Sequence, residues 1–194
     1  MNEDDPFVVF KEWMSEAEKN EINDPNAVAL ATVNESNQPD VRMVLLKEYN
    51  KNGFIFFTNL NSKKGTDLKK TPKASMCFHW KSLLRQVRIS GDISLISDDE
   101  ADKYFYSRPY LSKIGAWSSS QSKPMETRDA LLNKIDEYKN KFTDQSNVPR
   151  PGHWSGFLLS PNKIEFWKDV EGRLHQRLEY SKVSNSWERQ ILYP

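Results

Sequence analysis

The sequence is poor in glycine and histidine, and each shortage argues against a class of functional site. Seven of the 194 residues are glycine, and neither the G-x-G-x-x-G fingerprint of dinucleotide-binding folds nor the G-x-x-x-x-G-K-[ST] phosphate loop occurs. The three histidines, His79, His153 and His175, lack the spacing of metal ligands. A Rossmann dehydrogenase, a P-loop nucleotidase and a zinc hydrolase are therefore disfavoured, and we expect no metal site.

The chain also lacks a strong net charge and any long apolar run. Its 28 lysines and arginines against 27 acidic residues leave a formal charge of +1, so no bulk field attracts nucleic acid or an anionic membrane. The first residues are acidic rather than apolar, and the single cysteine, Cys77, can form no intramolecular disulfide. We expect a soluble protein of the reducing cytoplasm that binds neither nucleic acid nor a membrane.

Short runs rich in β-branched and aromatic residues dominate the chain and are separated by turn residues. Their order is strands, helices, strands rather than βαβ alternation, which favours an antiparallel sheet. Gly91, inside the longest run, predicts a bulge. The strands are predicted at residues 27–33, 41–47, 54–58, 74–80, 85–96, 154–159, 163–167, 173–180 and 187–192.

Helix signals lie at the start and in the middle of the chain. Asp5-Pro6 is typical of a helix start, Ser62 is a cap residue, and Ser97 to Glu100 has capping-box spacing. The four helices are predicted at residues 6–20, 63–71, 98–108 and 125–142. The length suits one domain, and we predict a mainly β fold, a nearly closed antiparallel barrel with peripheral helices.

Cations border two of these segments. Arg42 and Lys47 stand at the two ends of a β run, and since residues five apart in a strand face opposite sides, they should not share one small ligand without a twist or a bulge. Ser62-Lys63-Lys64, after Thr58, stands at a predicted helix N-terminus, where backbone N–H groups favour a phosphate. Solvated charges around a strand and a capped surface helix are the alternative interpretations.

Two further groups suit an anion. Tyr104, Arg108 and Ser112 are spaced by four along a predicted helix and the turn after it, which brings a phenol, a guanidinium and a hydroxyl within reach of one phosphate. Arg173, His175 and Arg177 alternate along a predicted strand, about 7 Å apart on one face. A packed tyrosine beside a solvated arginine, and a solvent-facing charged strand, are the respective alternatives.

Taken together in this order, these segments resemble the pyridoxamine/pyridoxine 5'-phosphate oxidase family over nearly the whole chain. Several spaced matches carry the resemblance, and no single one would suffice. They are Arg42-Met43-Val44-Leu45-Leu46-Lys47, Phe56-Phe57-Thr58-Asn59, Arg85-Gln86-Val87, Tyr104-Phe105-Tyr106-Ser107-Arg108-Pro109, Ile114-Gly115-Ala116-Trp117, Gln121-Ser122, Ile164-Glu165-Phe166-Trp167 and Arg173-Leu174-His175-Gln176-Arg177.

The resemblance implies an FMN-binding split β-barrel and a homodimer, with dimerisation strands at about residues 154–194 and two FMN sites at the subunit interface, each built from both chains. The substrate would be held by Lys47, Tyr104, Arg108 and Ser112 at its phosphate, with Arg173 and His175 as catalytic residues over the reacting end of the ring. FMN would be held by Arg42, Met43, Val44, Leu45, Leu46, Lys47, Phe57, Thr58, Lys63, Lys64, Gln86, Gln121, Ser122, Trp167 and Arg177.

The implied reaction is oxidation of pyridoxamine or pyridoxine 5'-phosphate by O₂ to pyridoxal 5'-phosphate, with release of hydrogen peroxide and, from the amine, ammonia. Two departures stand out: family members often carry a longer N-terminal arm that can cover the active site, and Lys63 stands where arginine is often found. The alternatives are a noncatalytic FMN or pyridoxal-phosphate carrier of the same fold and another split-barrel flavin oxidoreductase.

Overall fold

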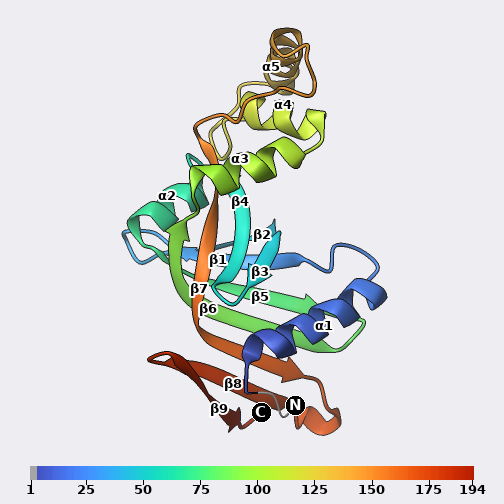
Figure 1. The fold of residues 1–194 in the computed structure, drawn as a ribbon, viewed down its shortest axis with the longest axis vertical. Helices are drawn as coiled ribbons and strands as arrows, with labels where there is room; N and C mark the ends of the chain where they lie inside the picture. Colours follow the sequence, from blue (N-terminus) through green and yellow to red (C-terminus); the bar gives the residue numbers. More distant parts are fainter. Residues whose placement is uncertain (1–3) are drawn as a thin grey trace.

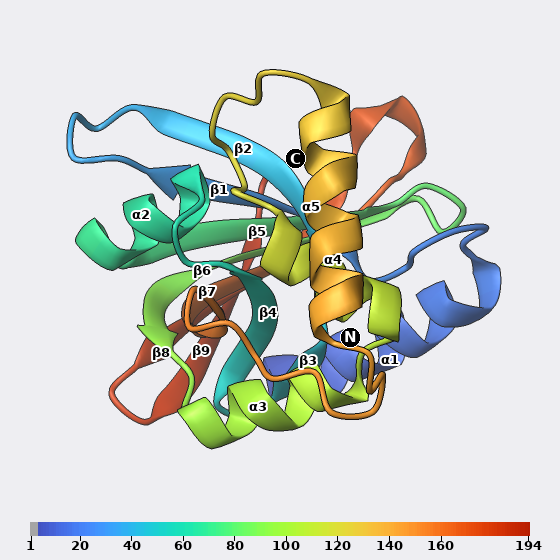
Figure 2. The ribbon, with the colours of Figure 1, turned by 90° about the horizontal axis from the view of Figure 1, so that it is seen from above.

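The protein is described by a computed structural model that covers residues 4–194, so the first three residues of the acidic N-terminus lie outside it. Nine antiparallel strands form one strongly curved sheet, and five α-helices surround it (Figures 1 and 2). The predicted class, mainly β with peripheral helices, is confirmed. Within residues 4–194 no helix is long and apolar enough to cross a membrane.

The sheet has the strand order β2-β1-β5-β6-β7-β4-β3, with β8 added to β7 and β9 to β8. The chain after β2 turns toward the far end of this order, where the Lys47 N–H donates to the Ile55 carbonyl of β4 at 2.9 Å. The strands are β1 (Ala27–Val33), β2 (Pro39–Leu45), β3 (Glu48–Asn50), β4 (Gly53–Asn59), β5 (Lys73–Trp80), β6 (Arg85–Leu95), β7 (Trp154–Lys168), β8 (Gln176–Val183) and β9 (Ser186–Leu192).

The helices lie mainly at one end of the barrel. The C-terminal hairpin of β8 and β9 lies at the opposite end (Figure 1). The helices are α1 (Pro6–Asn20), α2 (Lys63–Lys70), α3 (Asp98–Ser107), α4 (Tyr110–Ser118) and α5 (Arg128–Lys141). Asp5 caps α1, Ser62 caps α2, and Ser97 forms the predicted capping box of α3 with Glu100.

Helix α1 supplies much of the core because its apolar face packs into the barrel. Phe10 is fully buried, and its ring centroid lies 4.9 Å from that of Phe54 and 5.4 Å from that of Phe78. Met14 and Ala17, one and two turns further along the helix, are buried as well. A second, smaller cluster around Phe105 and Trp154 joins the upper helices to the sheet.

Three sequence predictions were wrong in detail. Helix α4 was predicted to be a turn because Pro109 ends α3, but the chain resumes a helix one residue later, with Pro109 itself at the N-cap. Helix α5, predicted at residues 125–142, is confined to Arg128–Lys141 and buries none of its side chains. The strands predicted at 154–159 and 163–167 are one continuous strand, β7, because the bulge at Gly91 of β6 accommodates Pro161 within it.

Position 91 therefore requires glycine, because the backbone of β7 lies close to it. A Cβ added there would lie 2.1 Å from the Ser160 carbonyl oxygen and 2.8 Å from the Pro161 Cα. Both are backbone atoms, which cannot move as a flexible side chain would. We expect Gly91→Ala to lower the free energy of unfolding by about 1–3 kcal/mol, measured by urea denaturation.

Gly152→Ala is the matched control, because no atom lies within 4 Å of its added Cβ. It should change the free energy of unfolding by less than about 0.5 kcal/mol. Equal stabilities of the two variants would show that the Gly91 bulge tolerates a side chain.

Candidate active site

A cavity of about 560 Å³ opens where β2 and β4 meet α2, α3 and α4. Cations, hydroxyls and aromatic rings from distant parts of the chain converge on it. It is lined by Arg42, Met43, Val44, Leu45, Lys47, Phe57, Thr58, Asn59, Lys64, Tyr104, Arg108, Ser112, Gly115, Ala116, Ser119, Gln121 and Trp154.

Arg42 and Lys47 both line this cavity, although a regular strand would separate them. Strand β2 ends at Leu45, and the Leu46 N–H then donates to the Asn26 carbonyl before Lys47 joins β4. The chain therefore changes direction between the two cations. The strand predicted over residues 41–47 begins and ends two residues later than the observed strand, and the change of direction that brings the cations together lies in residues 46 and 47.

One group of polar residues surrounds the ammonium of Lys64. Its Nζ donates to Gln121 Oε1 at 3.1 Å and to Thr58 Oγ1 at 3.4 Å, and the side chain is largely buried. Burial, and next the positive charge of Arg42, lower the pKa of Lys64. None of the ion pairs found within residues 4–194 involves Lys64, so this buried cation favours an anionic ligand.

A second group lies on α3 and α4. The guanidinium of Arg108 lies 4.7 Å above the ring centroid of Trp154, and its Nη1 is buried with no hydrogen-bond partner among residues 4–194. Burial lowers the pKa of Arg108. Tyr104 stacks on Phe57 with the ring centroids 3.9 Å apart. An unpartnered buried guanidinium requires an acceptor, as the predicted phosphate site would supply.

Ser112 lines the same cavity as Tyr104 and Arg108, as the spacing predicted. Its position differs from the prediction, because Ser112 lies in the first turn of α4 and not in a turn after α3. The new helix continues the chain in the direction that keeps the hydroxyl near the guanidinium.

Three predicted cofactor residues next to this cavity do not line it. Lys63 instead forms ion pairs with Asp67 at 2.9 Å and Asp40 at 3.8 Å. Leu46 is buried in the barrel core, only 3% exposed. Ser122 lines a neighbouring hollow beneath α5.

The remaining predicted residues gather at the C-terminal end of the barrel. Gln86 of β6 pairs with Trp167 of β7, which in turn pairs with Arg177 of β8. The ring centroids of Trp167 and His175 lie 4.7 Å apart. His175 and Arg177 line a separate cavity of about 620 Å³ together with the last four residues of the chain.

The predicted alternation of Arg173, His175 and Arg177 on one strand is wrong. Arg173 ends a 3₁₀ turn (Glu171–Arg173) with a φ of 62°, and β8 begins only at Gln176. Gly172, with a φ of 71°, allows the left-handed turn that interrupts the strand. His175 Nδ1 lies 2.8 Å from Asp169 Oδ1, which orients the imidazole from the preceding loop.

Trp154 is the main cavity residue that was not predicted. Its ring lies parallel to those of Phe57 and Tyr104, with interplanar angles of 8° and 3°. The sequence has six tryptophans, and nothing in it distinguishes Trp154 from the other five. Its place in the site is evident only from the structure, where it contacts Arg108. Asn59, Gly115, Ala116 and Ser119 were also missed, although the first three lie in the stretches that carry the family resemblance.

Comparison with known proteins finds the same family along nearly the whole chain. The family model described as pyridoxamine 5'-phosphate oxidase matches residues 14–142, and the one described as the pyridoxine 5'-phosphate oxidase C-terminal dimerisation region matches residues 154–194. A pyridoxine/pyridoxamine 5'-phosphate oxidase of Pelagibacter ubique is 57% identical, over 98% of this chain and 92% of the relative. One from Allorhizobium ampelinum is 51% identical, over 100% and 94%.

Solved structures support the same fold. PhzG from Burkholderia lata, in complex with tetrahydrophenazine-1-carboxylic acid, has a TM-score of 0.94 and 30% identity, over 100% of this chain and 94% of that one. A pyridoxamine 5'-phosphate oxidase-related, FMN binding protein from Nostoc punctiforme has a TM-score of 0.78 at 16% identity, over 98% of each chain. The predicted split barrel is confirmed, and the chain belongs to the pyridoxine/pyridoxamine 5'-phosphate oxidase family.

Proposed function

We propose that this enzyme oxidises pyridoxamine or pyridoxine 5'-phosphate with O₂, giving pyridoxal 5'-phosphate and hydrogen peroxide, and ammonia from the amine. The observation that carries the proposal is the cavity with two separate cations, the buried Lys64 and the half-buried Arg108, neither of which has a carboxylate partner within residues 4–194. Two phosphate groups, one on a cofactor and one on a substrate, match this arrangement. The free thiol Cys77 is compatible with the cytoplasm, the compartment we propose.

FMN is the cofactor that we propose, and when bound it supplies the redox chemistry, accepting a hydride from the substrate and passing two electrons to O₂. Lys64, Arg42, Thr58 and Gln121 would hold its phosphate, because Thr58 and Gln121 contact the buried Lys64 ammonium and Arg42 lines the same cavity. The other cofactor residues would be Met43, Val44, Leu45, Leu46, Lys47, Phe57, Lys63, Ser122, Gln86, Trp167 and Arg177.

The substrate phosphate would be bound by Arg108, Ser112 and Tyr104, with Lys47 at the same cavity. Trp154 supports the guanidinium of Arg108 from below and excludes water from it. Binding the phosphate would fix the position of the substrate's pyridine ring. The protein would thus contribute orientation to a reaction whose redox chemistry is supplied by the cofactor.

The remaining residues would come from a second copy of the chain. Trp154 and Trp167 lie on the same strand, 13 residues apart, which is up to roughly 40 Å along an extended backbone. In agreement with this separation, no residue after Trp154 lines the cavity of its own chain. Apolar side chains that suit a dimer are exposed on both parts, with Met43 of β2 at 62% and Ile191 of β9 at 85%.

In this dimer, Arg173 and His175 of one copy would lie over the reacting end of the substrate in the other. His175 is held by Asp169, which favours the imidazole as a proton carrier of fixed orientation. Arg173 sits in the left-handed turn after Gly172, which projects it from the barrel.

The test of the function is an anaerobic reaction with pyridoxamine 5'-phosphate. We expect the yellow absorbance of the FMN-loaded protein to bleach and to return when air is admitted, as pyridoxal 5'-phosphate appears. Arg173→Ala should bind FMN normally but bleach at least about 100-fold more slowly, because it removes a contact made at the reacting end. A flavin that stays oxidised in the wild type would identify a carrier.

Arg108 is expected to determine phosphate recognition. Arg108→Met should raise the KM for pyridoxamine 5'-phosphate by about 30-fold or more, since a charge-assisted hydrogen bond to the phosphate is lost. The matched control is pyridoxamine, which has no phosphate and should be oxidised equally slowly by both proteins in steady-state assays. An unchanged KM would assign the phosphate to another site.

The pKa shift of Lys64 predicts how FMN affinity depends on pH. Because burial lowers this pKa below the ordinary lysine value of 10.5, the ammonium is charged below the lowered pKa and loses its charge as pH rises through it. FMN affinity should therefore fall in the alkaline range before 10.5 is reached. Flavin fluorescence quenching at each pH measures the affinity.

Lys64→Met is the control for this titration, and it should bind FMN more weakly but without that alkaline loss. Riboflavin shares the titration of the flavin ring and lacks the phosphate, so its binding should show no contribution from Lys64. A wild-type profile that matches that of Lys64→Met would assign the alkaline limb to another group.

A further inference from the structure

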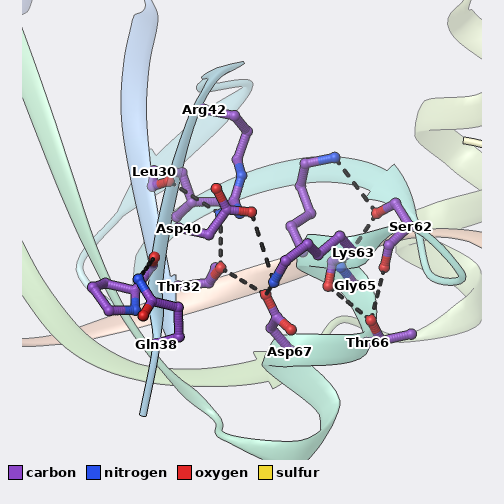
Figure 3. A network of polar contacts seen from close by, with 12 residues as sticks. Leu30, Thr32, Gln38, Asp40, Arg42, Ser62, Lys63, Gly65, Thr66 and Asp67 are labelled. Carbon is purple, nitrogen blue, oxygen red and sulfur yellow. Dashed lines mark hydrogen bonds and ion pairs between the residues drawn. The ribbon is translucent and has the colours of Figure 1, made fainter. Parts of the chain in front are cut away.

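A series of polar contacts beside the cavity connects strands β1 and β2 with helix α2 (Figure 3). The Arg42 Nη1 donates to the Thr32 hydroxyl at 2.8 Å, and this hydroxyl donates to the Asp67 carboxylate at 3.2 Å. The same carboxylate oxygen accepts from the Lys63 ammonium at 2.9 Å. Thr32 is therefore the bridge between a cation of β2 and a carboxylate of α2.

Thr32 and Asp67 are buried, so their polar atoms depend on each other for hydrogen bonds. Thr32 has no exposed surface, and Asp67 is 7% exposed. The Thr32 hydroxyl can donate one hydrogen bond, which it makes to Asp67, and its oxygen accepts a hydrogen bond from Arg42. An apolar side chain at this position would leave both a guanidinium N–H and a buried carboxylate oxygen without this partner.

The bridge fixes the plane of the Arg42 guanidinium. Nη1 also donates to the Leu30 carbonyl at 3.2 Å, and Nη2 donates to Asp40 at 2.6 Å. Of the five guanidinium N–H groups, these contacts use three, and Nε has no partner within residues 4–194. The remaining donors are left for a ligand of the cavity that Arg42 lines.

We propose that Thr32 is a positioning residue for the cofactor phosphate: its buried hydroxyl sets the orientation of Arg42 and, through Asp67, ties that orientation to Lys63 on α2. The inference rests on the proposed FMN site and deepens it. Thr32 is not among the residues that line the cavity; it lies on β1, where its backbone pairs with Asp40 of β2. Its effect on binding acts only through the cation that it holds.

The experiment compares Thr32→Val, which keeps the shape and removes the hydroxyl, with Thr32→Ser, which keeps the hydroxyl. The apoprotein is titrated with FMN and with riboflavin, and binding is followed by quenching of flavin fluorescence. Thr32→Val should weaken FMN binding about tenfold and leave riboflavin binding unchanged, whereas Thr32→Ser should bind FMN within about twofold of the wild type.

A double-mutant cycle shows whether the effect passes through Arg42. In an Arg42→Met background, Thr32→Val should weaken FMN binding by less than about twofold, because the cation that it positions is gone. Thr32→Ala repeats the test with a smaller side chain if the valine variant does not fold, and it should lose the same FMN affinity.

Three results would overturn the proposal. If Thr32→Val binds FMN as tightly as the wild type, Thr32 has no positioning role, and the proposed FMN site is unaffected. An equal loss for FMN and riboflavin, or a full loss in the Arg42→Met background, would indicate a general change of structure. Failure of the wild type to prefer FMN over riboflavin would instead remove the phosphate site itself, and with it the proposed cofactor.

Discussion

The continuous strand β7 is the constraint on which the rest of the structure depends. It pairs with β6 along most of its length, with β4 at its first half and with β8 at its second half. Trp154 at its start lies in the cavity, and Trp167 near its end lies beside His175. This strand thus separates five of the predicted site residues, among them Trp167 and His175, from the cavity at its other end, and for this reason we propose that a second chain completes the site.

The sequence was most informative where local chemistry decides the backbone. Strand β1 was predicted to the residue, and the caps at Ser62 and Ser97 were predicted correctly, because a short polar side chain satisfies the free N–H groups of a helix start wherever the helix lies. The Gly91 bulge was predicted for a similar reason. The strand and the caps depend on neighbours within a few residues, whereas the bulge was marked by the glycine itself although its contacts are with Ser160 and Pro161.

Features set by contacts between distant segments were less predictable. Lys63 and Lys64 are neighbours in the sequence, yet one forms ion pairs with Asp40 and Asp67 while the other is buried beside Gln121. The predicted alternation of Arg173 and Arg177 failed because positive φ angles at Gly172 and Arg173 form a turn, and β8 begins only at Gln176. The grouping of the cavity residues followed from the family resemblance, and spacing alone would have left solvated charges as the simpler interpretation.

The fold by itself does not select the substrate, as the likeness to PhzG shows. That protein shares the barrel at a TM-score of 0.94, and its structure holds a tricyclic carboxylic acid. A barrel of one shape therefore serves different ring systems, and specificity is a property of the side chains. In this chain the Arg108 guanidinium, whose Nη1 has no hydrogen-bond partner among residues 4–194, lies over Trp154 and lines the same cavity as Ser112. A doubly charged phosphate gains more from that guanidinium than a single carboxylate does, since the Coulomb attraction grows with the ligand charge. The cations of the cavity, rather than the barrel, thus favour a phosphorylated substrate.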